Sequence, residues 1–204
     1  AICTDGSKGT WDPSADLAAL VATRQDEARS AAAALGATGE VVFLGRVAGE
    51  LENDRATRSA LARVIRELRP DVLLGHDPWK RHRLHPDHRA AGFLTTDALV
   101  AARDPHFFPE HGLAPHRPSA LLLFEADDAD HAEVVGAADV EAKIAALEAH
   151  RSQYESTMFI SGGGPEADAE RERFRAEVRR DVADAGAWAG VDLAERFCLM
   201  ATDR

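Results

Sequence analysis

Apolar and polar positions along the first half of the chain predict strands joined by helices. The apolar runs VVFLG (41–45) and DVLLGH (71–76) are typical of short buried strands, and AICT reads as the end of another. Apolar residues at helical spacing predict a helix from Asp16 to Gly36. A second helix is expected to begin after a cap at Asn53 or Asp54 and to end at Arg69, before a proline. The predicted order is therefore βαβαβ.

The second half continues the alternation. A helix is expected to open at Pro86, and a Pro-rich connection (104–118) leads to the strand ALLLFEA, a helix from Asp139 to about Arg151 and a final strand in VDLAERFCLMAT. Strands alternating with helices predict an α/β fold with a mainly parallel sheet covered on both faces. Ligands bind such sheets beyond the carboxyl ends of the strands. The loops DGSKG and HDPWKRHRLHPDH follow strands, so we expect both at that edge.

One segment departs from this pattern. Residues 160–187 combine a glycine run with dense alternating charge, which indicates a flexible or lid segment, or else a solvated helix. Because the length suits one core, we predict a single domain over residues 1–204.

Composition narrows the function. The net charge of −11 disfavours nucleic acid and anionic membranes as partners, so the substrate is expected to be a small molecule. No apolar run approaches the roughly 20 residues that span a bilayer. Cys3 and Cys198 are far apart and form no CxxC, which favours a cytoplasmic protein over a disulfide framework or a thiolate zinc site. Helix-rich faces leave room for a homo-oligomer.

The stretch RLHPDHRAAG carries the most specific chemistry. If Pro86 opens a helix, His85 and His88 lie at i, i+3 on one face and can address one site. That arrangement suits a metal or acid/base centre. The alternative is a helix cap with two solvated histidines. A Ser/His hydrolase is disfavoured because the chain has no G-x-S-x-G motif.

Several motifs occur in an order that resembles a known family. They are TDGSKG, RQDEARSAAAALG, IRELRPDVLLGHDP, LHPDHRAAG and KIAALEAHRSQ. Together they are similar to the LmbE-like zinc-dependent de-N-acetylases, which include N-acetylglucosaminyl-phosphatidylinositol de-N-acetylase and the mycothiol and bacillithiol deacetylases. The resemblance covers residues 1 to about 155. It implies a Rossmann-like, three-layer α/β/α fold and a hydrolase that cleaves the linear amide bond of an N-acetylated amino sugar or its conjugate.

The resemblance also implies roles for individual residues. His88 corresponds to a ligand of Zn²⁺, and His85 to the histidine that stabilises the tetrahedral oxyanion or protonates the leaving amine. Asp87 would orient an imidazole. Arg24, in an R-x-x-E helix, corresponds to a substrate-binding arginine. A surface ion pair between Arg24 and Glu27 is an equally weighted alternative.

The sequence departs from the family pattern in ways that bear on the metal. The HPDDE motif, which supplies two further zinc ligands and the general base, is absent, so we expect the first strand to lie before Ala1 and zinc to bind residues 1–204 weakly or not at all. Ala48 and Arg83 replace an aspartate and a tyrosine found in some members, which puts the substrate in doubt. The alternative function is a non-catalytic, LmbE-like binding or regulatory module.

Overall fold

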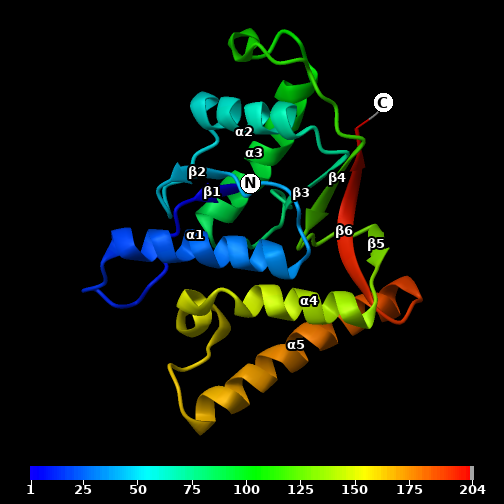
Figure 1. The fold of residues 1–204 in the computed structure, drawn as a ribbon. Helices are drawn as coiled ribbons and strands as arrows, with labels where there is room; N and C mark the ends of the chain where they lie inside the picture. The colour runs from blue at the N-terminus through cyan, green and yellow to red at the C-terminus, as the bar shows by residue number, and fades with distance from the viewer. Residues whose placement is uncertain (203–204) are drawn as a thin grey trace. The chain divides into compact units, whose positions relative to one another are not determined.

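The computed structural model describes residues 1–202, and its elements confirm the predicted alternation of strands and helices (Figure 1). The strands are β1 (Ile2–Thr4), β2 (Phe43–Arg46), β3 (Val72–His76), β4 (Ala120–Phe124), β5 (His131–Val134) and β6 (Ala194–Ala201). The α-helices are α1 (Leu17–Ala34), α2 (Arg55–Leu68), α3 (Pro86–Arg103), α4 (Ala137–Glu148) and α5 (Pro165–Ala189). Short helical turns follow α3 and α4 at Pro109–His111, Arg151–Gln153 and Tyr154–Met158.

The chain forms two compact units. One comprises Ala1–Thr4, Val42–His131 and the residues from Arg196 onward, and the other comprises Asp5–Val41 and Ala132–Glu195. In the first unit β1 pairs with β2 in parallel, β3 pairs with β4 in parallel, and β4 pairs with β6 in antiparallel orientation. The parallel ladders agree with the predicted α/β class. The antiparallel β6 and the short β5, which complete the strand order β3-β4-β6-β5, are details that the sequence pattern did not distinguish.

Predicted helix boundaries agree with the capping chemistry. The Asp16 carboxylate caps α1, and the Asp54 carboxylate accepts the N–H of Thr57 at the start of α2. Arg69 ends α2 in the left-handed conformation, directly before Pro70. Pro86 is the first residue of α3, as predicted.

Helices α2 and α3 lie side by side in the first unit and enclose its main core (Figure 1). Leu61 and Ile65 of α2 pack with Leu94 and Ala98 of α3, all of them buried. The buried guanidinium of Arg66, on α2, donates hydrogen bonds to carbonyls at the end of α3, including those of Ala101, Ala102 and Asp104. These carbonyls have no partners within the helix, so Arg66 caps α3 from its neighbour.

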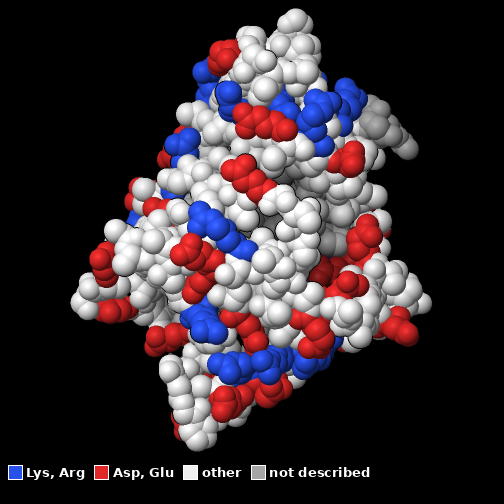
Figure 2. All heavy atoms as spheres, viewed as in Figure 1, with Lys and Arg blue, Asp and Glu red and all other residues white. Residues whose placement is uncertain are grey.

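Most of the charge-dense segment (160–187) is helical and lies in the second unit. Residues from Pro165 form a regular helix, whose Val178 and Val182 pack against Val140 and Ile144 of α4. Along the exposed side of α5, arginines pair with glutamates three positions away, and Figure 2 shows a row of basic side chains there with acidic ones beside it. The solvated-helix interpretation is thus confirmed. The lid function stays a prediction.

No α-helix within residues 1–202 is both long and apolar enough to cross a lipid bilayer.

Helix α3 approaches the end of β3 very closely at Gly92. A Cβ atom at this position would lie 2.6 Å from the carbonyl oxygen of His76 and 2.9 Å from the nitrogen of Pro78. Both contacts are with backbone, which cannot rotate away. Only glycine therefore permits the approach that brings the start of α3 to the end of β3.

We expect Gly92→Ala to lower the free energy of unfolding by about 1–3 kcal/mol, because the added methyl group forces backbone apart in a packed region. Chemical denaturation of the variant and the wild type measures the difference. Gly39→Ala is the matched control: its Cβ would meet nothing within 4 Å, so its stability should stay near that of the wild type. Equal stability of all three proteins would contradict the close approach.

Candidate active site

The ends of two parallel strands place the first residues of the site. His76 is the last residue of β3 and lies in register with Phe124, the last residue of β4. Glu125 follows β4 directly and has a positive φ of 56°, a left-handed conformation that costs energy for a residue with a side chain. His76 and Glu125 therefore meet at the carboxyl edge of the β3–β4 ladder. This is where ligands bind in open α/β sheets.

The start of α3 brings the predicted histidines to the same edge. His85 is the N-cap residue, and its Nδ1 accepts the backbone N–H of Asp87 at 3.2 Å. The helix-cap interpretation is therefore correct for His85. It does not separate the two rings, because the centroids of His85 and His88 lie 4.6 Å apart with planes only 18° from parallel.

Three imidazoles form a continuous stack. His88 also stacks on His76, with centroids 4.3 Å apart and an interplanar angle of 14°, so His88 is the middle ring. Burial, followed by the neighbouring charge of His85, lowers the pKa of His88. Burial, followed by the charges of His88 and Arg83, lowers the pKa of His76 to about 4. His76 and His88 are consequently neutral near pH 7, the form that can offer a lone pair.

A buried arginine, Arg83, contacts His76 at one end of this stack. The Arg83 side chain is only 4% exposed, and its Nη1 donates to Glu125 Oε2 at 2.6 Å and contacts His76 Nδ1 at 3.1 Å. Burial is the largest single influence on the pKa of Glu125 and raises it, but the hydrogen bond from Arg83 and the nearby charges of Arg83, His76 and Lys80 together outweigh burial, so the pKa is lowered. Glu125 is therefore an anion matched to a buried cation.

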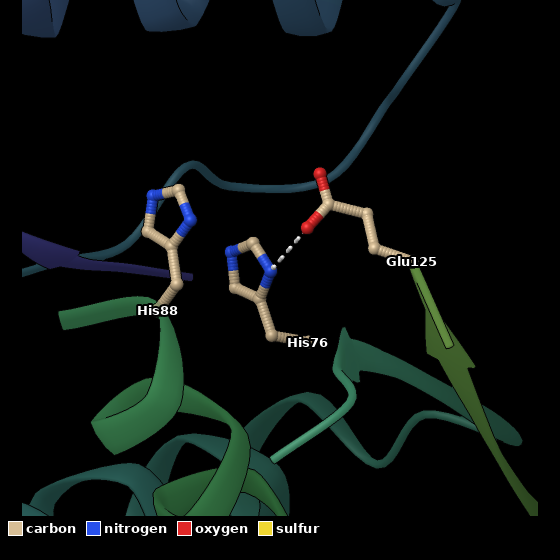
Figure 3. A group of neighbouring side chains, drawn as sticks. All are labelled: His76, His88 and Glu125. Carbon is tan, nitrogen blue, oxygen red and sulfur yellow. Dashed lines mark ion pairs between the residues drawn. The ribbon is translucent and has the colours of Figure 1, made fainter. Parts of the chain in front are cut away.

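His76, His88 and Glu125 form a group of the kind that can hold a metal ion. Their donor atoms lie within 4.8 Å of one another, and Figure 3 shows the three side chains converging from β3, α3 and the end of β4. Histidine and glutamate are ligand types that Zn²⁺ accepts. However, Glu125 Oε2 and His76 Nδ1 already face the Arg83 guanidinium, a permanent cation. Of the three, His88 fits a zinc ion best.

The Asp87 carboxylate has a different partner from the one predicted. It is buried, and its oxygens accept the backbone N–H groups of Gly49 at 2.6 Å and Leu51 at 3.2 Å. These bonds fix the turn after β2 against the start of α3. His85 is oriented by the backbone N–H of Asp87 rather than by its carboxylate. The hydrogen bonds of this carboxylate are to two backbone donors, and its role in orienting an imidazole stays a prediction.

Arg24 lies in the second unit, where its contacts are with the turn after β1. Its Nη2 donates to the carbonyl of Gly9 at 3.2 Å, and a Cβ at Gly6 or Gly9 would collide with the Arg24 side chain. The DGSKG glycines thus make room for the guanidinium. The substrate-binding role of Arg24 stays a prediction.

Glu27 is not part of a surface ion pair. It is buried, and its two oxygens accept the N–H and hydroxyl of Ser152 at 2.8 and 2.6 Å. The R-x-x-E and H-x-S-Q motifs, far apart in sequence, are therefore joined within the second unit. The surface alternative fails because Glu27 has a long-range partner.

His76 and Glu125 are site residues that the sequence reasoning missed. Each stands at the end of an apolar strand, His76 within DVLLGH and Glu125 directly after ALLLF. Strand-end polar residues of parallel neighbours share one edge, and this signal could have identified them.

Comparison with known proteins shows that the chain is similar to proteins named as deacetylases. Residues 1–99 match the PIG-L family, described as GlcNAc-PI de-N-acetylase. Diacetylchitobiose deacetylase of Thermococcus kodakarensis is 34% identical over 162 residues, covering 78% of this chain and 60% of that protein. A 1D-myo-inositol 2-acetamido-2-deoxy-alpha-D-glucopyranoside deacetylase of Frankia casuarinae is 32% identical over 136 residues, covering 49% and 43%. The chain thus spans 60% or less of the length of these two curated relatives.

A solved structure confirms the fold class. N,N'-diacetylchitobiose deacetylase from Pyrococcus horikoshii, in complex with its inhibitor MPG, superposes with a TM-score of 0.81 and 28% sequence identity. The match covers 98% of this chain and 71% of that one. The α/β, Rossmann-like class expected from the strand and helix order is therefore correct.

Proposed function

The chain belongs to the PIG-L (LmbE-like) family, and from this membership we propose that the protein is a zinc-dependent hydrolase that removes the acetyl group from an N-acetylated amino sugar of the N-acetylglucosamine type. The observation that carries the proposal is the stack of His85, His88 and His76 at the carboxyl edge of the β3–β4 ladder. Its two motif histidines fall within the part of the chain that matches the family.

The proposed reaction is the hydrolysis of an acetamide. The oxygen of water bonds to the acyl carbon, the carbonyl becomes an oxyanion, and the C–N bond then breaks. The nitrogen takes up a proton that originates from the attacking water, and the products are acetate and an amine. A bound Zn²⁺ supplies polarisation of the carbonyl and lowers the pKa of water to about 7. In this chain His88 would be one of the residues that hold it.

The capping bond of His85 favours one of the two roles implied for this residue. Because His85 Nδ1 accepts a backbone N–H, the neutral ring carries its proton on Nε2. Protonating the leaving amine would require a cationic ring, which must give up the capping bond. A hydrogen bond from Nε2–H to the developing oxyanion requires no such change. We therefore assign His85 to the oxyanion.

The direct test uses the protein as its gene encodes it, purified and supplied with Zn²⁺. We expect release of free amine from N,N'-diacetylchitobiose or N-acetylglucosamine, measured with an amine-reactive fluorophore. Removal of zinc by a chelator should abolish release, and restored zinc should return it. Zinc-independent binding of these sugars without hydrolysis would instead support the binding-module alternative and contradict the proposal.

Substitution should separate the two motif histidines. We expect His88→Ala to lose bound zinc and activity together, because a ligand is removed. His85→Asn should keep zinc and lower kcat by about 10²–10³-fold, since asparagine can retain the cap but lacks the imidazole Nε2–H. Zinc content and initial rates are measured side by side.

His82→Ala, at an exposed histidine of the same loop, is the control and should behave as the wild type. The assignment is reversed if His85→Asn loses the metal while His88→Ala keeps it.

A further inference from the structure

The neighbours of His76 determine which of its ring nitrogens carries the proton. Arginine donates hydrogen bonds and accepts none, so the 3.1 Å contact from Arg83 Nη1 requires an unprotonated Nδ1 on His76. The competing arrangement would have His76 Nδ1–H donate to Glu125 Oε2. That separation is 3.6 Å, which is too long for a hydrogen bond. The neutral His76 ring therefore carries its proton on Nε2.

Arg83 is held firmly enough to impose this tautomer. Its side chain is almost entirely buried, and its bond of 2.6 Å to Glu125 is short and charge-assisted. The loop that carries Arg83 is tied to the same edge by two further bonds, from Lys80 Nζ to the Glu125 carbonyl at 3.0 Å and from the Arg81 N–H to Asp127 Oδ2 at 2.9 Å. The left-handed backbone of Glu125 is consistent with a residue held in place for this task.

The Nε2–H of His76 faces the region beside His88. In Figure 3 the nitrogen of His76 opposite Glu125 lies on the side of the ring nearest His88. The two rings are stacked and nearly parallel, so an in-plane N–H of one cannot point at the in-plane lone pair of the other. The His76 side chain is 21% exposed, so part of it is open to a bound molecule.

We propose that His76 is a further catalytic residue, whose Nε2–H donates a hydrogen bond to the acyl oxygen of the substrate as it becomes an oxyanion, with Arg83 and Glu125 as its positioning residues. The proposal rests on the proposed function, since it needs an amide carbonyl beside His88. His76 keeps its proton throughout and supplies stabilisation only. His85 and His76, which lie on either side of His88, then have the same hydrogen-bond pattern. In each ring Nδ1 accepts from a donor of the protein, and Nε2–H is left for the substrate.

This role is incompatible with His76 as a zinc ligand. A ligating nitrogen must offer a lone pair, but Nδ1 accepts from a buried guanidinium and Nε2 is protonated. In this proposal His76 contacts the substrate and not a metal ion, even though its atoms lie within reach of a metal site.

The tautomer can be observed without any catalytic assay. Two-dimensional NMR of protein labelled with ¹⁵N-histidine distinguishes Nε2–H from Nδ1–H rings, and His76→Ala identifies which signals belong to His76. At neutral pH we expect the Nε2–H pattern for His76. Addition of Zn²⁺ should shift the signals of His88 and leave the His76 pattern unchanged. An Nδ1–H pattern, or loss of the His76 proton on adding Zn²⁺, would overturn the proposal.

Kinetics then test the contribution to catalysis. We expect His76→Ala to retain zinc and a KM near that of the wild type while kcat falls about 10²–10³-fold, as for loss of one oxyanion donor. Arg83→Met should also lower kcat, because the His76 ring can then carry its proton on Nδ1, facing Glu125. It would then no longer offer Nε2–H to the substrate. The double variant should be no slower than His76→Ala alone, since Arg83 acts through His76. His82→Ala again serves as the control.

The outcomes separate the two proposals. An active wild type whose His76→Ala variant keeps most of its kcat would overturn the role of His76 and leave the proposed function standing. Loss of zinc in His76→Ala would show a metal ligand instead. A wild type that hydrolyses neither acetylated sugar would contradict the proposed function and this role with it.

Discussion

The site depends on the buried positive charge of the Arg83 guanidinium. Taking the Arg83 guanidinium out of water is costly unless charge and hydrogen bonds compensate it; Glu125 supplies the opposite charge, and Glu125 and His76 both accept from Nη1. Glu125, in a left-handed conformation at the end of β4, accepts from Arg83, and the Arg83 contact requires Nδ1 to be the accepting nitrogen of His76. The role of each imidazole in the stack depends on the groups that its ring nitrogens contact. Two of the three residues with metal-like geometry, His76 and Glu125, are thus hydrogen-bond partners of Arg83.

Local chemistry made much of this fold predictable from the sequence. Pro86 at the first helical position, the Asp54 cap and the apolar strand ending at His76 are decided by neighbours in sequence, and the structure agrees with each. The pairing of His85 with His88 followed from helical spacing alone. Spacing could not show that His85 is both a cap and a site residue, because that depends on the orientation of its ring.

Long-range partners account for what sequence reasoning missed. Asp87 bonds to Gly49, 38 positions away, and Glu27 bonds to Ser152, 125 positions away. No periodicity links such pairs, so Asp87 appeared to serve an imidazole and Glu27 appeared to serve a surface ion pair. In both cases a motif carboxylate satisfies backbone or hydroxyl donors of a distant turn.

Arg83, and not a metal ion, neutralises Glu125 and donates to His76 Nδ1, which leaves His88 as the one member of the group that can bind zinc. A crystal of the protein as its gene encodes it, grown with Zn²⁺ and measured on both sides of the zinc absorption edge, tests this directly. We predict an anomalous peak within bonding distance of a His88 ring nitrogen, with Arg83 still bonded to Glu125. A peak bonded to Glu125 and His76, with Arg83 displaced, would contradict it.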